Sequence, residues 1–234
     1  MTTPVLTPEE RRRIETASWF SALSPALRHD ILGRTIIRRY PDGIQIGTRG
    51  APATEWLAVA QGAVRISSVS VTGKQITLTY VEPGTWFGDI SLLDGLPHTH
   101  DATTQGPTTL LIVRKHDFMD LLARHPELSE ALLRLNCGRL RRMFASFEDL
   151  NTRPLSARLA KQVMHLARNH GIAQGQETRI GLQLAQEDLA QLVGASRQRV
   201  NQELKGFERE GAVRVEPTRL VVLSREKLRA IAER

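Results

Sequence analysis

The sequence predicts an α+β protein: an N-terminal antiparallel β jelly-roll barrel, a long dimerisation helix and a C-terminal winged helix-turn-helix. Three observations support this prediction: closely spaced turn dipeptides over residues 36–113, an apolar helical edge after Pro126, and a basic final third with a glycine turn between two short helices. A chain of 234 residues can bury the cores of one or two domains. We expect the barrel in residues 1–125, the helix in 126–150 and the winged unit in 151–234.

Alternation of apolar residues supports the barrel. It is clear in Val64 and Ile66 and in Ile76, Leu78 and Tyr80. Strands at this spacing are typical of antiparallel barrels and jelly rolls. The turns expected between them are Asp42-Gly43, Gln61-Gly62, Thr72-Gly73, Pro83-Gly84, Asp94-Gly95 and Gly106-Pro107.

The helix after Pro126 carries two apolar edges. The first has steps of four and three, as in a coiled-coil seam, and predicts a homodimer interface. Its residues are Leu133, Cys137, Leu140, Phe144 and Phe147. The alternative is a helix that lies on its own barrel, but a second edge can do that. This second edge comprises Leu128, Leu132, Leu135 and Met143.

The segment from Asn151 to Pro154 breaks this helix and is the expected hinge. Pro154 suits the first position of the next helix, since its missing N–H is not needed there. That helix is expected to run to about His170, with Gly171 as its stop.

Residues 184–210, LAQEDLAQLVGASRQRVNQELKGFERE, predict a helix-turn-helix. A helix from Gln186 to Val193 is followed by the turn Gly194-Ala195, and a second helix begins at Ser196, a good N-cap. Ala185 stands where a capping hydroxyl is expected before the first helix, and Asp188 is expected to compensate in part through the helix dipole.

The second helix has one buried and one polar face. At 100° per residue, Val200, Leu204 and Phe207 fall on the core side. The opposite face is free of acids, and its glutamines suit adenine while its cations suit phosphates. Arg197, at the helix start, can reach guanine. The predicted DNA-binding residues are Ser196, Arg197, Gln198, Arg199, Gln202, Lys205 and Arg209. The alternative is an ordinary solvated helix face.

Two short strands, 212–215 and 219–223, follow and predict a wing in which Thr218 or Arg219 could touch a phosphate.

The charge balance agrees with a nucleic-acid partner. The chain has a net charge of +7, and residues 151–234 contribute 15 Lys and Arg against 9 Asp and Glu. A basic domain beside a neutral one indicates an anionic partner.

Composition also excludes several classes. No apolar run approaches the roughly 20 residues that span a bilayer, and the opening residues lack the apolar core of a signal peptide, so we expect a cytoplasmic protein without a membrane partner. Cys137 is the single cysteine, which excludes an intrachain disulfide and an iron–sulfur cluster.

In the order of its parts the chain resembles the CRP/FNR family of bacterial transcription regulators. The resemblance extends from Phe20 to the wing. Its most specific stretches are Gly62-Ala-Val-Arg-Ile66, Gly88-Asp-Ile-Ser-Leu-Leu-Asp-Gly95 and Val193-Gly-Ala-Ser-Arg-Gln-Arg-Val200. It implies a cyclic-nucleotide-binding-type barrel, a dimer helix, double-stranded DNA and RNA polymerase as partners. The common Arg-Glu-Arg readers of the family correspond to Arg197, Gln198 and Gln202.

Residues 88–99 correspond to the phosphate cassette, the segment that holds the cyclic phosphate and the ribose in the cyclic-AMP-binding members of the family. The sequence of this cassette differs from theirs. Their ribose-binding Glu corresponds to Asp89 and their phosphate-binding Arg to His98, although Thr99 keeps the hydroxyl. Met143 and Phe144 stand where small hydroxyl residues contact adenine. We therefore do not expect cyclic AMP as the ligand. The candidate effector residues are Gly88, Asp89, Ser91, His98, Thr99, Met143 and Phe144.

Three interpretations of residues 88–102 stay open. The backbone N–H groups after Gly88 can cradle an anion, with a histidine that strengthens binding at low pH. His98 and His100, two apart on a strand, can hold a metal ion. The segment can also be a structural turn.

We expect a homodimeric transcription regulator on an inverted repeat, and not an enzyme, because no catalytic residue set is recognisable. The small effector, if one binds, is anionic or a nucleotide other than cyclic AMP. The alternatives are the same regulator with a ligand-free barrel, and a metal-dependent barrel enzyme with a DNA-binding tail.

Overall fold

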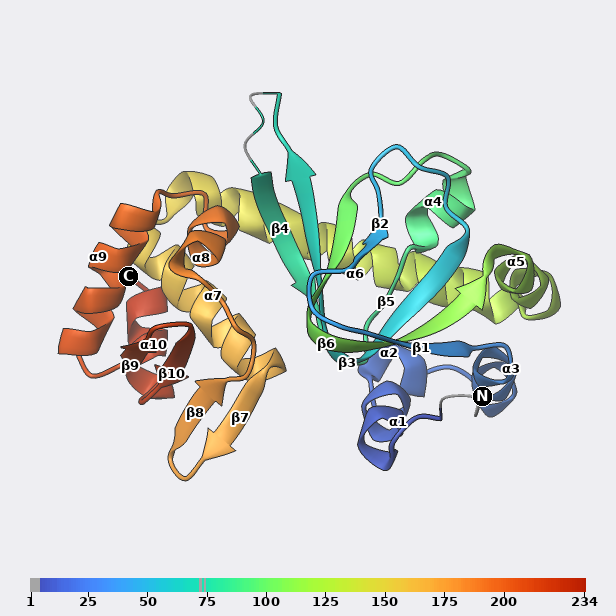
Figure 1. Cartoon of the computed structure of the whole chain (residues 1–234), viewed down its shortest axis with the longest axis horizontal. Coiled ribbons are helices and arrows are strands. Elements are labelled where there is room, and N and C mark those ends of the chain that lie inside the picture. Colours follow the sequence, from blue (N-terminus) through green and yellow to red (C-terminus); the bar gives the residue numbers. More distant parts are fainter. Residues whose placement is uncertain (1–4, 72, 74) are drawn as a thin grey trace. The chain divides into compact units, whose positions relative to one another are not determined.

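The computed structural model describes residues 5–71, 73 and 75–234. Contacts divide the chain into two units, which are described one after the other. The N-terminal unit comprises the residues up to Ser68 and Thr79–Arg141, and the C-terminal unit comprises Val69–Leu78 and Arg142–Arg234. The division falls inside the long helix α6 (Pro126–Thr152), which belongs to both units (Figure 1).

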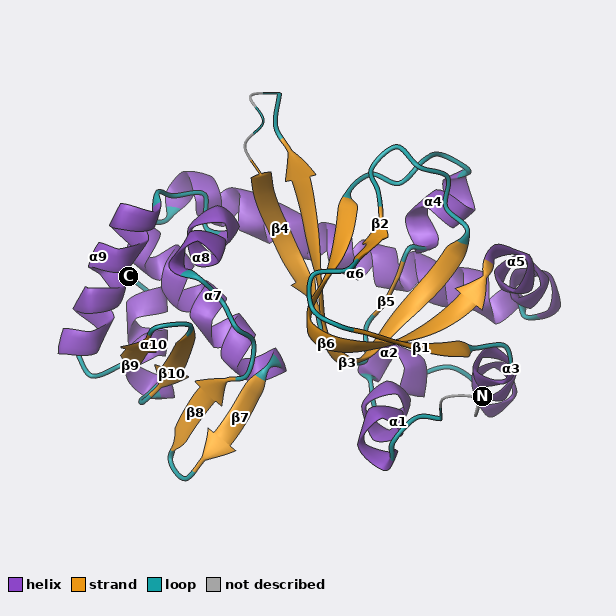
Figure 2. Ribbon diagram, in the orientation of Figure 1, coloured by secondary structure: helices purple, strands orange, loops and turns teal. Residues whose placement is uncertain are grey.

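The strands between Ile36 and Arg114 form an antiparallel sheet, as the turn spacing predicts (Figure 2). Their residues belong to the N-terminal unit, apart from Val69 and Gln75–Leu78, which belong to the C-terminal unit. Strand β6 pairs with β1, β2 and β3, while β3 also pairs with β4 and β5. The strands are β1 (Ile36–Tyr40), β2 (Gln45–Gly47), β3 (Glu55–Val69), β4 (Gln75–Val81), β5 (Trp86–Phe87) and β6 (Asp101–Arg114).

Two strands are longer than the sequence predicts. Gln61-Gly62 and Gly106-Pro107 are predicted as turns, but they lie inside β3 and β6. The register of β3 against β6 shifts on both sides of Gln61, so the local break is a β-bulge within a continuous pair of strands. The predicted turn Asp94-Gly95 ends a helix instead of joining two strands. Thr72 lies outside the described residues.

Short helices surround this sheet, and the hydrophobic periodicity of the sequence does not predict them. They are α1 (Pro8–Glu15), α2 (Ser18–Ser21), α3 (Pro25–Gly33), α4 (Asp89–Asp94) and α5 (Lys115–Arg124). The starts of α1 and α3 have recognisable signals: Thr7 and Ser24 accept a hydrogen bond from the third helical N–H, and a proline follows each.

Two apolar clusters hold the N-terminal unit together. One lies among Leu57, Val59, Leu110 and Ile112. The other joins the sheet to the helices through aromatic rings: Phe20 of α2 stacks on Trp86, with ring centroids 5.8 Å apart, and Trp86 contacts Trp56 at 4.1 Å in a tilted arrangement. From α6, Leu128 and Leu132 are fully buried in this second cluster, as the second apolar edge predicts. Met143 does not continue that edge, because 59% of its surface is exposed.

The C-terminal unit combines a helix-turn-helix with a second antiparallel sheet, in the strand order β7-β8-β10-β9 (Figures 1 and 2). Its elements are α7 (Leu155–Asn169), β7 (Gly171–Gln174), β8 (Glu177–Ile180), α8 (Gln186–Leu192), α9 (Arg197–Arg209), β9 (Val213–Glu216), β10 (Arg219–Val222) and α10 (Arg225–Ala232). The predicted helix-turn-helix and wing are confirmed, whereas the β7–β8 hairpin and α10 are additions.

Two local predictions need correction. Pro154 is the N-cap of α7 and not its first residue, because its backbone is still extended (ψ 158°). At the start of α8, Asp188 does more than interact with the helix dipole: its carboxylate accepts a hydrogen bond from the Ala185 N–H at 2.8 Å. Among the described residues, no helix is long and apolar enough to cross a membrane.

Candidate DNA-binding surface and effector site

The inner face of α9 fixes the orientation of the helix. Val200 and Leu204 are completely buried, and 2% of Phe207 is exposed. Ser196 caps the first turn by accepting the Arg199 N–H at 3.3 Å. The buried face and the cap together determine which side chains point away from the unit.

The turn before α9 needs its glycine. Gly194 has φ +64°, in the left-handed region that other residues rarely adopt. A side chain at this position would also come within 3.3 Å of Leu150 in α6. The turn is therefore fixed both by backbone conformation and by the end of the long helix.

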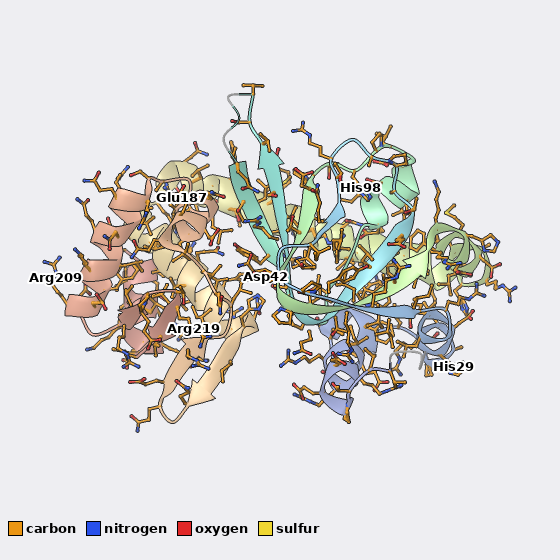
Figure 3. The ribbon with its side chains drawn as sticks, in the orientation of Figure 1. His29, Asp42, His98, Glu187, Arg209 and Arg219 are labelled. Carbon is orange, nitrogen blue, oxygen red and sulfur yellow. The ribbon has the colours of Figure 1, made fainter. Side chains whose placement is uncertain are left out.

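The outer face of α9 presents polar side chains that make no hydrogen bond or close ion pair with the described residues. All of the side chains predicted to read or hold DNA from Arg197 onward are exposed. None of them makes a side-chain hydrogen bond or an ion pair with another described residue: Arg197, Gln198, Arg199, Gln202, Lys205 and Arg209. Figure 3 shows Arg209 directed away from the body of the C-terminal unit. This face offers amides and cations to an outside partner.

The wing follows α9. Thr218 is exposed and Arg219 is half-buried at the turn between β9 and β10 (Figure 3). Next to it, Arg214 pairs with Glu177 at 2.8 Å and so ties β9 to the β7–β8 hairpin. Thr218 and Arg219 are thus available beside α9, while Arg214 is engaged within the sheet.

Arg158 connects the expected hinge to the helix-turn-helix. Its guanidinium donates to the carbonyl oxygens of Leu150 (3.0 Å) and Arg153 (3.3 Å) at the end of α6, and to that of Val193 (3.2 Å) in the turn before α9. Asp149 adds an ion pair to Lys161 of α7 at 2.6 Å. One side chain therefore bonds both the end of the long helix and the turn that positions α9.

The phosphate cassette forms the end of β5 and helix α4. Gly88 precedes the helix with φ +88°, and a side chain there would lie 3.1 Å from the Glu55 carbonyl oxygen. Asp89 is the first helical residue and is completely buried. A buried carboxylate needs compensating charge and hydrogen bonds.

Two residues of α6 supply that compensation. Arg139 Nη1 donates to both oxygens of Asp89, at 2.9 and 2.8 Å, and its other nitrogen donates to the Trp86 carbonyl oxygen. Asn136 Nδ2 donates to Asp89 at 2.8 Å. Both oxygens of the cassette acid are therefore engaged within the protein.

The sequence carries a signal for Arg139 that lies outside the cassette motif. The barrel-facing edge of α6 runs through Leu128, Leu132 and Leu135, and position 139 continues it at helical spacing. A cation on an apolar, core-facing edge needs a buried acid as a partner. Asp89 is that acid.

Ser91 and the histidines are arranged differently from the prediction. Ser91 is buried, and its hydroxyl donates to the Pro97 carbonyl oxygen at 3.1 Å. His98 lies in the loop between α4 and β6 (Figure 3), where its backbone pairs with Gly50 and Ala51. Strand β6 begins only at Asp101, so the prediction that two histidines share one face of a strand is wrong.

Thr99 is exposed, and its hydroxyl oxygen lies 2.8 Å from Nδ1 of His100. Burial lowers the pKa of His100 below its ordinary value of 6.5, and Arg49 lowers it further, against a smaller opposing effect of Asp101. In the described part of the chain, no three His, Cys, Asp or Glu side chains are grouped as a metal site requires.

The predicted dimer edge of α6 is open along its length. The exposed fractions are 65% for Leu133, 45% for Leu140, 62% for Phe144 and 67% for Phe147, and Cys137 is exposed as well. Exposed apolar side chains along one helix edge, with two phenylalanines among them, form a candidate interaction surface.

Comparison with known families gives two matches. A family model of the cyclic nucleotide-binding domain matches residues 37–125, and a family model of the Crp-like helix-turn-helix domain matches residues 157–231.

Related proteins match across most of the chain. It is 33% identical over 189 residues to a CRP-like cAMP-activated global transcriptional regulator of Mycobacterium tuberculosis, covering 81% of this chain and 84% of that protein. It is 31% identical over 197 residues to the cyclic AMP receptor protein of Thermus thermophilus, covering 83% and 87%. These relatives are transcription regulators and not enzymes.

Solved structures share the fold. FixK2 from Bradyrhizobium japonicum has a TM-score of 0.74 at 19% identity, over 84% of this chain and 96% of that one. A CRP-family transcriptional regulator from Thermus thermophilus has a TM-score of 0.71 at 24% identity, over 84% and 97%.

Proposed function

We propose a function for this chain on the basis that it belongs to the CRP/FNR family of transcription regulators and carries a helix-turn-helix DNA-binding domain. In this proposal the protein is a cytoplasmic homodimer that binds an inverted-repeat operator, and cyclic AMP is not its effector. One observation above all supports the DNA-binding part. The exposed face of α9 carries amides and cations, and none of them has a partner inside the described protein.

Each of these side chains has a proposed role. Arg197 reads a guanine, whose O6 and N7 suit a guanidinium, and Gln198 and Gln202 read adenines through N6 and N7. Arg199, Lys205, Arg209 and the wing hold phosphates and set the position of the helix without reading sequence. Ser196 caps α9 and directs its first turn into the groove.

The exposed edge of α6 supports the homodimer. Its residues recur at the spacing of a coiled-coil seam, so two copies can bury them against each other. Two recognition helices related by a two-fold axis enter successive major grooves, about 34 Å apart. The operator is therefore an inverted repeat, and RNA polymerase is the further partner that the family implies.

The cassette residues do not fit cyclic AMP. Asp89 is shorter than the family's Glu, is completely buried, and has both oxygens bonded to Arg139 and Asn136. His98 lacks the permanent forked charge that suits a phosphate. We therefore propose that the cyclic AMP named for the relatives does not control this chain, and that any small effector is of another class.

Selection from random duplex DNA tests the DNA-binding part of the proposal. The full-length protein is expected to enrich an inverted repeat with half-site centres about 10 to 10.5 base pairs apart, or a multiple of that spacing. Enrichment of no sequence over the starting pool would overturn the proposal.

Light scattering tests the dimer. The double variant Phe144→Glu/Phe147→Glu is expected to be a monomer with strongly reduced operator affinity, because four charges would face each other across the seam. Met119→Glu is a matched control, since Met119 of α5 is also exposed, at 46%, but lies off the seam. A dimeric Phe144→Glu/Phe147→Glu variant would show that the seam lies elsewhere.

Transmission from the dimer helix to α9 is proposed to run through Arg158. Arg158→Met removes the bonds to Leu150, Arg153 and Val193. The variant is expected to stay dimeric and to lose operator affinity, because the turn before α9 is no longer tied to the end of α6. Unchanged affinity would exclude this path.

Thermal unfolding with cyclic nucleotides tests the effector statement. A ligand of the folded state at a concentration about 100 times its Kd adds about 2.7 kcal/mol of stability. Cyclic AMP at about 1 mM would show this effect for a Kd of about 10 μM. We expect no shift of the unfolding midpoint, and a saturable upward shift would contradict the proposal.

A further inference from the structure

One residue on the outer half of α9 is unexpected for a helix interior. Gly206 lies in the middle of the last two turns, between Lys205 and Phe207. Glycine is the least favourable residue in a helix interior apart from proline, because it loses the most backbone freedom on folding. Another residue at position 206 would stabilise the helix, so the presence of glycine there needs an explanation other than helix stability.

The fold of the chain does not supply that reason. Gly206 is in an ordinary right-handed helix and is not among the glycines with positive φ. A Cβ atom built at this position meets no atom within 4 Å, whereas at Gly171 it would lie 2.1 Å from the Ala167 carbonyl oxygen. Neither backbone conformation nor internal packing excludes a side chain at 206.

The position of Gly206 on the helix places it beside the proposed reading face. At 100° per residue it lies about 20° from Arg199 and about 40° from Gln202 around the helix axis. The buried residues Val200, Leu204 and Phe207 are all about 100° or more away. Gly206 is thus a position without a side chain on an otherwise polar, outward-facing surface.

The charges around Gly206 indicate what approaches it. Arg209 lies about 60° and Lys205 about 100° from Gly206 around the helix axis. Neither side chain makes a hydrogen bond or a close ion pair with a described residue, although the charge of Arg209 helps to lower the pKa of Glu210. The acids nearest along the chain are Glu208, Glu203 and Glu210. Glu208 lies on the opposite side of α9, about 160° from Gly206, and accepts the Val215 N–H at 2.7 Å. Glu210 is held by Arg234 at 2.7 and 3.2 Å, and its pKa is lowered by that pair. An anionic partner is favoured over an acidic or neutral protein surface.

We propose that Gly206 is the point of closest approach between α9 and the DNA backbone. Its missing side chain lets the helix enter the major groove deeply enough for Gln198 and Gln202 to reach the bases. This inference rests on the proposed DNA-binding function. It adds a residue that makes no side-chain hydrogen bond and acts through its size alone. Gly206 is therefore a positioning residue.

Substitution of Gly206 tests this in the full-length dimer, with the duplex selected from random DNA and a random duplex of equal length. Gly206→Ala is expected to raise the midpoint of thermal unfolding by about 2 to 4 °C, because alanine favours the helix. The same variant is expected to bind the selected duplex at least tenfold more weakly, and Gly206→Leu more weakly still. Binding to the random duplex should change less than threefold, since that binding depends mainly on long-range phosphate attraction.

Gly33→Ala is the matched control. Gly33 also lies in a helix, α3, without positive φ and with open space where a Cβ atom would stand, but in the N-terminal unit. Its substitution should leave both affinities unchanged. A Gly206→Ala variant that binds the selected duplex within threefold of the wild type would overturn the inference, as would one that melts at a lower temperature. If the wild type itself prefers no sequence, the proposed function fails instead.

Discussion

The polar side chains of the two candidate sites differ in burial and in whether they are bonded within their own unit. In the C-terminal unit, the side chains on the outer face of α9 are exposed and have no partner among the described residues. In the N-terminal unit, the cassette acid Asp89 is buried and bonded to Arg139 and Asn136. Unpaired groups are ready for a partner, whereas paired buried groups mainly hold the fold together. The contrast supports the proposed DNA surface in the C-terminal unit and, in the N-terminal unit, a cassette whose acid serves the protein itself.

The largest effect is expected from breaking the buried pair in the N-terminal unit. Arg139→Met leaves the Asp89 carboxylate buried without its cation, which should lower the free energy of unfolding by about 3 to 5 kcal/mol. Denaturant unfolding measures this loss. Asp89→Asn/Arg139→Met should recover part of it, because no uncompensated charge remains. A loss below about 1 kcal/mol for the single variant would show that the pair is not structural.

A second internal pair makes the N-terminal unit sensitive to acid. Burial alone would raise the pKa of Glu10, but hydrogen bonds from Arg39, the Thr7 N–H and Thr109 outweigh it and lower the pKa to about 2. The folded pKa lies below the ordinary value of 4.5, so this stabilisation is present above pH 4.5 and is lost as the pH falls toward 2. It is on the order of 3 kcal/mol.

Glu10→Gln removes this contribution. The variant should therefore lose stability near pH 7 and show a flatter decline of stability between pH 4.5 and 2 than the wild type. Unfolding curves over that pH range provide the comparison. Parallel curves for the two proteins would mean that other carboxylates carry the acid sensitivity.

In the C-terminal unit, the same kind of substitution should change binding and not stability. Arg197→Ala removes an exposed side chain without an internal partner among the described residues, so the unfolding midpoint should stay constant. Discrimination at one guanine per half-site should fall by about 1 to 3 kcal/mol. Competition binding with operator variants measures this. Equal weakening on all sequences would reassign Arg197 to a phosphate.

The smallest expected effect concerns the cap of α9. Ser196→Ala removes the acceptor of the Arg199 N–H and should cost about 1 kcal/mol of stability. Because the cap also sets the first turn of α9, operator affinity should fall with it. Ser196→Asp, which restores an acceptor, should recover stability but not affinity, since its charge repels phosphate. Recovery of both would limit Ser196 to a structural role.

The C-terminal unit could be predicted from the sequence because its signals are local. The period of Val200, Leu204 and Phe207, the turn at Gly194 and the cap at Ser196 all lie within one short segment. The wing is predicted from two apolar runs around a proline. The β7–β8 hairpin escapes prediction because its strands are short and β7 is entirely exposed, which leaves no alternation to detect.

The cassette could be located but not interpreted from the sequence. Its motif gives the position of Asp89, yet the partner Arg139 lies 50 positions away on another element. Only the packing of α6 against the barrel brings them together. The histidines are misplaced because the prediction assumes a strand where helix α4 and a loop occur, and the pairing of His98 with Gly50 and Ala51 depends on contacts that no local pattern contains.

The affinity of the full-length protein for its selected operator, measured with and without about 1 mM cyclic AMP, tests the contrast between the two units most directly. We predict tight, sequence-specific binding that cyclic AMP leaves unchanged, because the α9 face is ready and the cassette acid is already engaged. Operator affinity that rises tenfold or more with cyclic AMP would contradict this prediction.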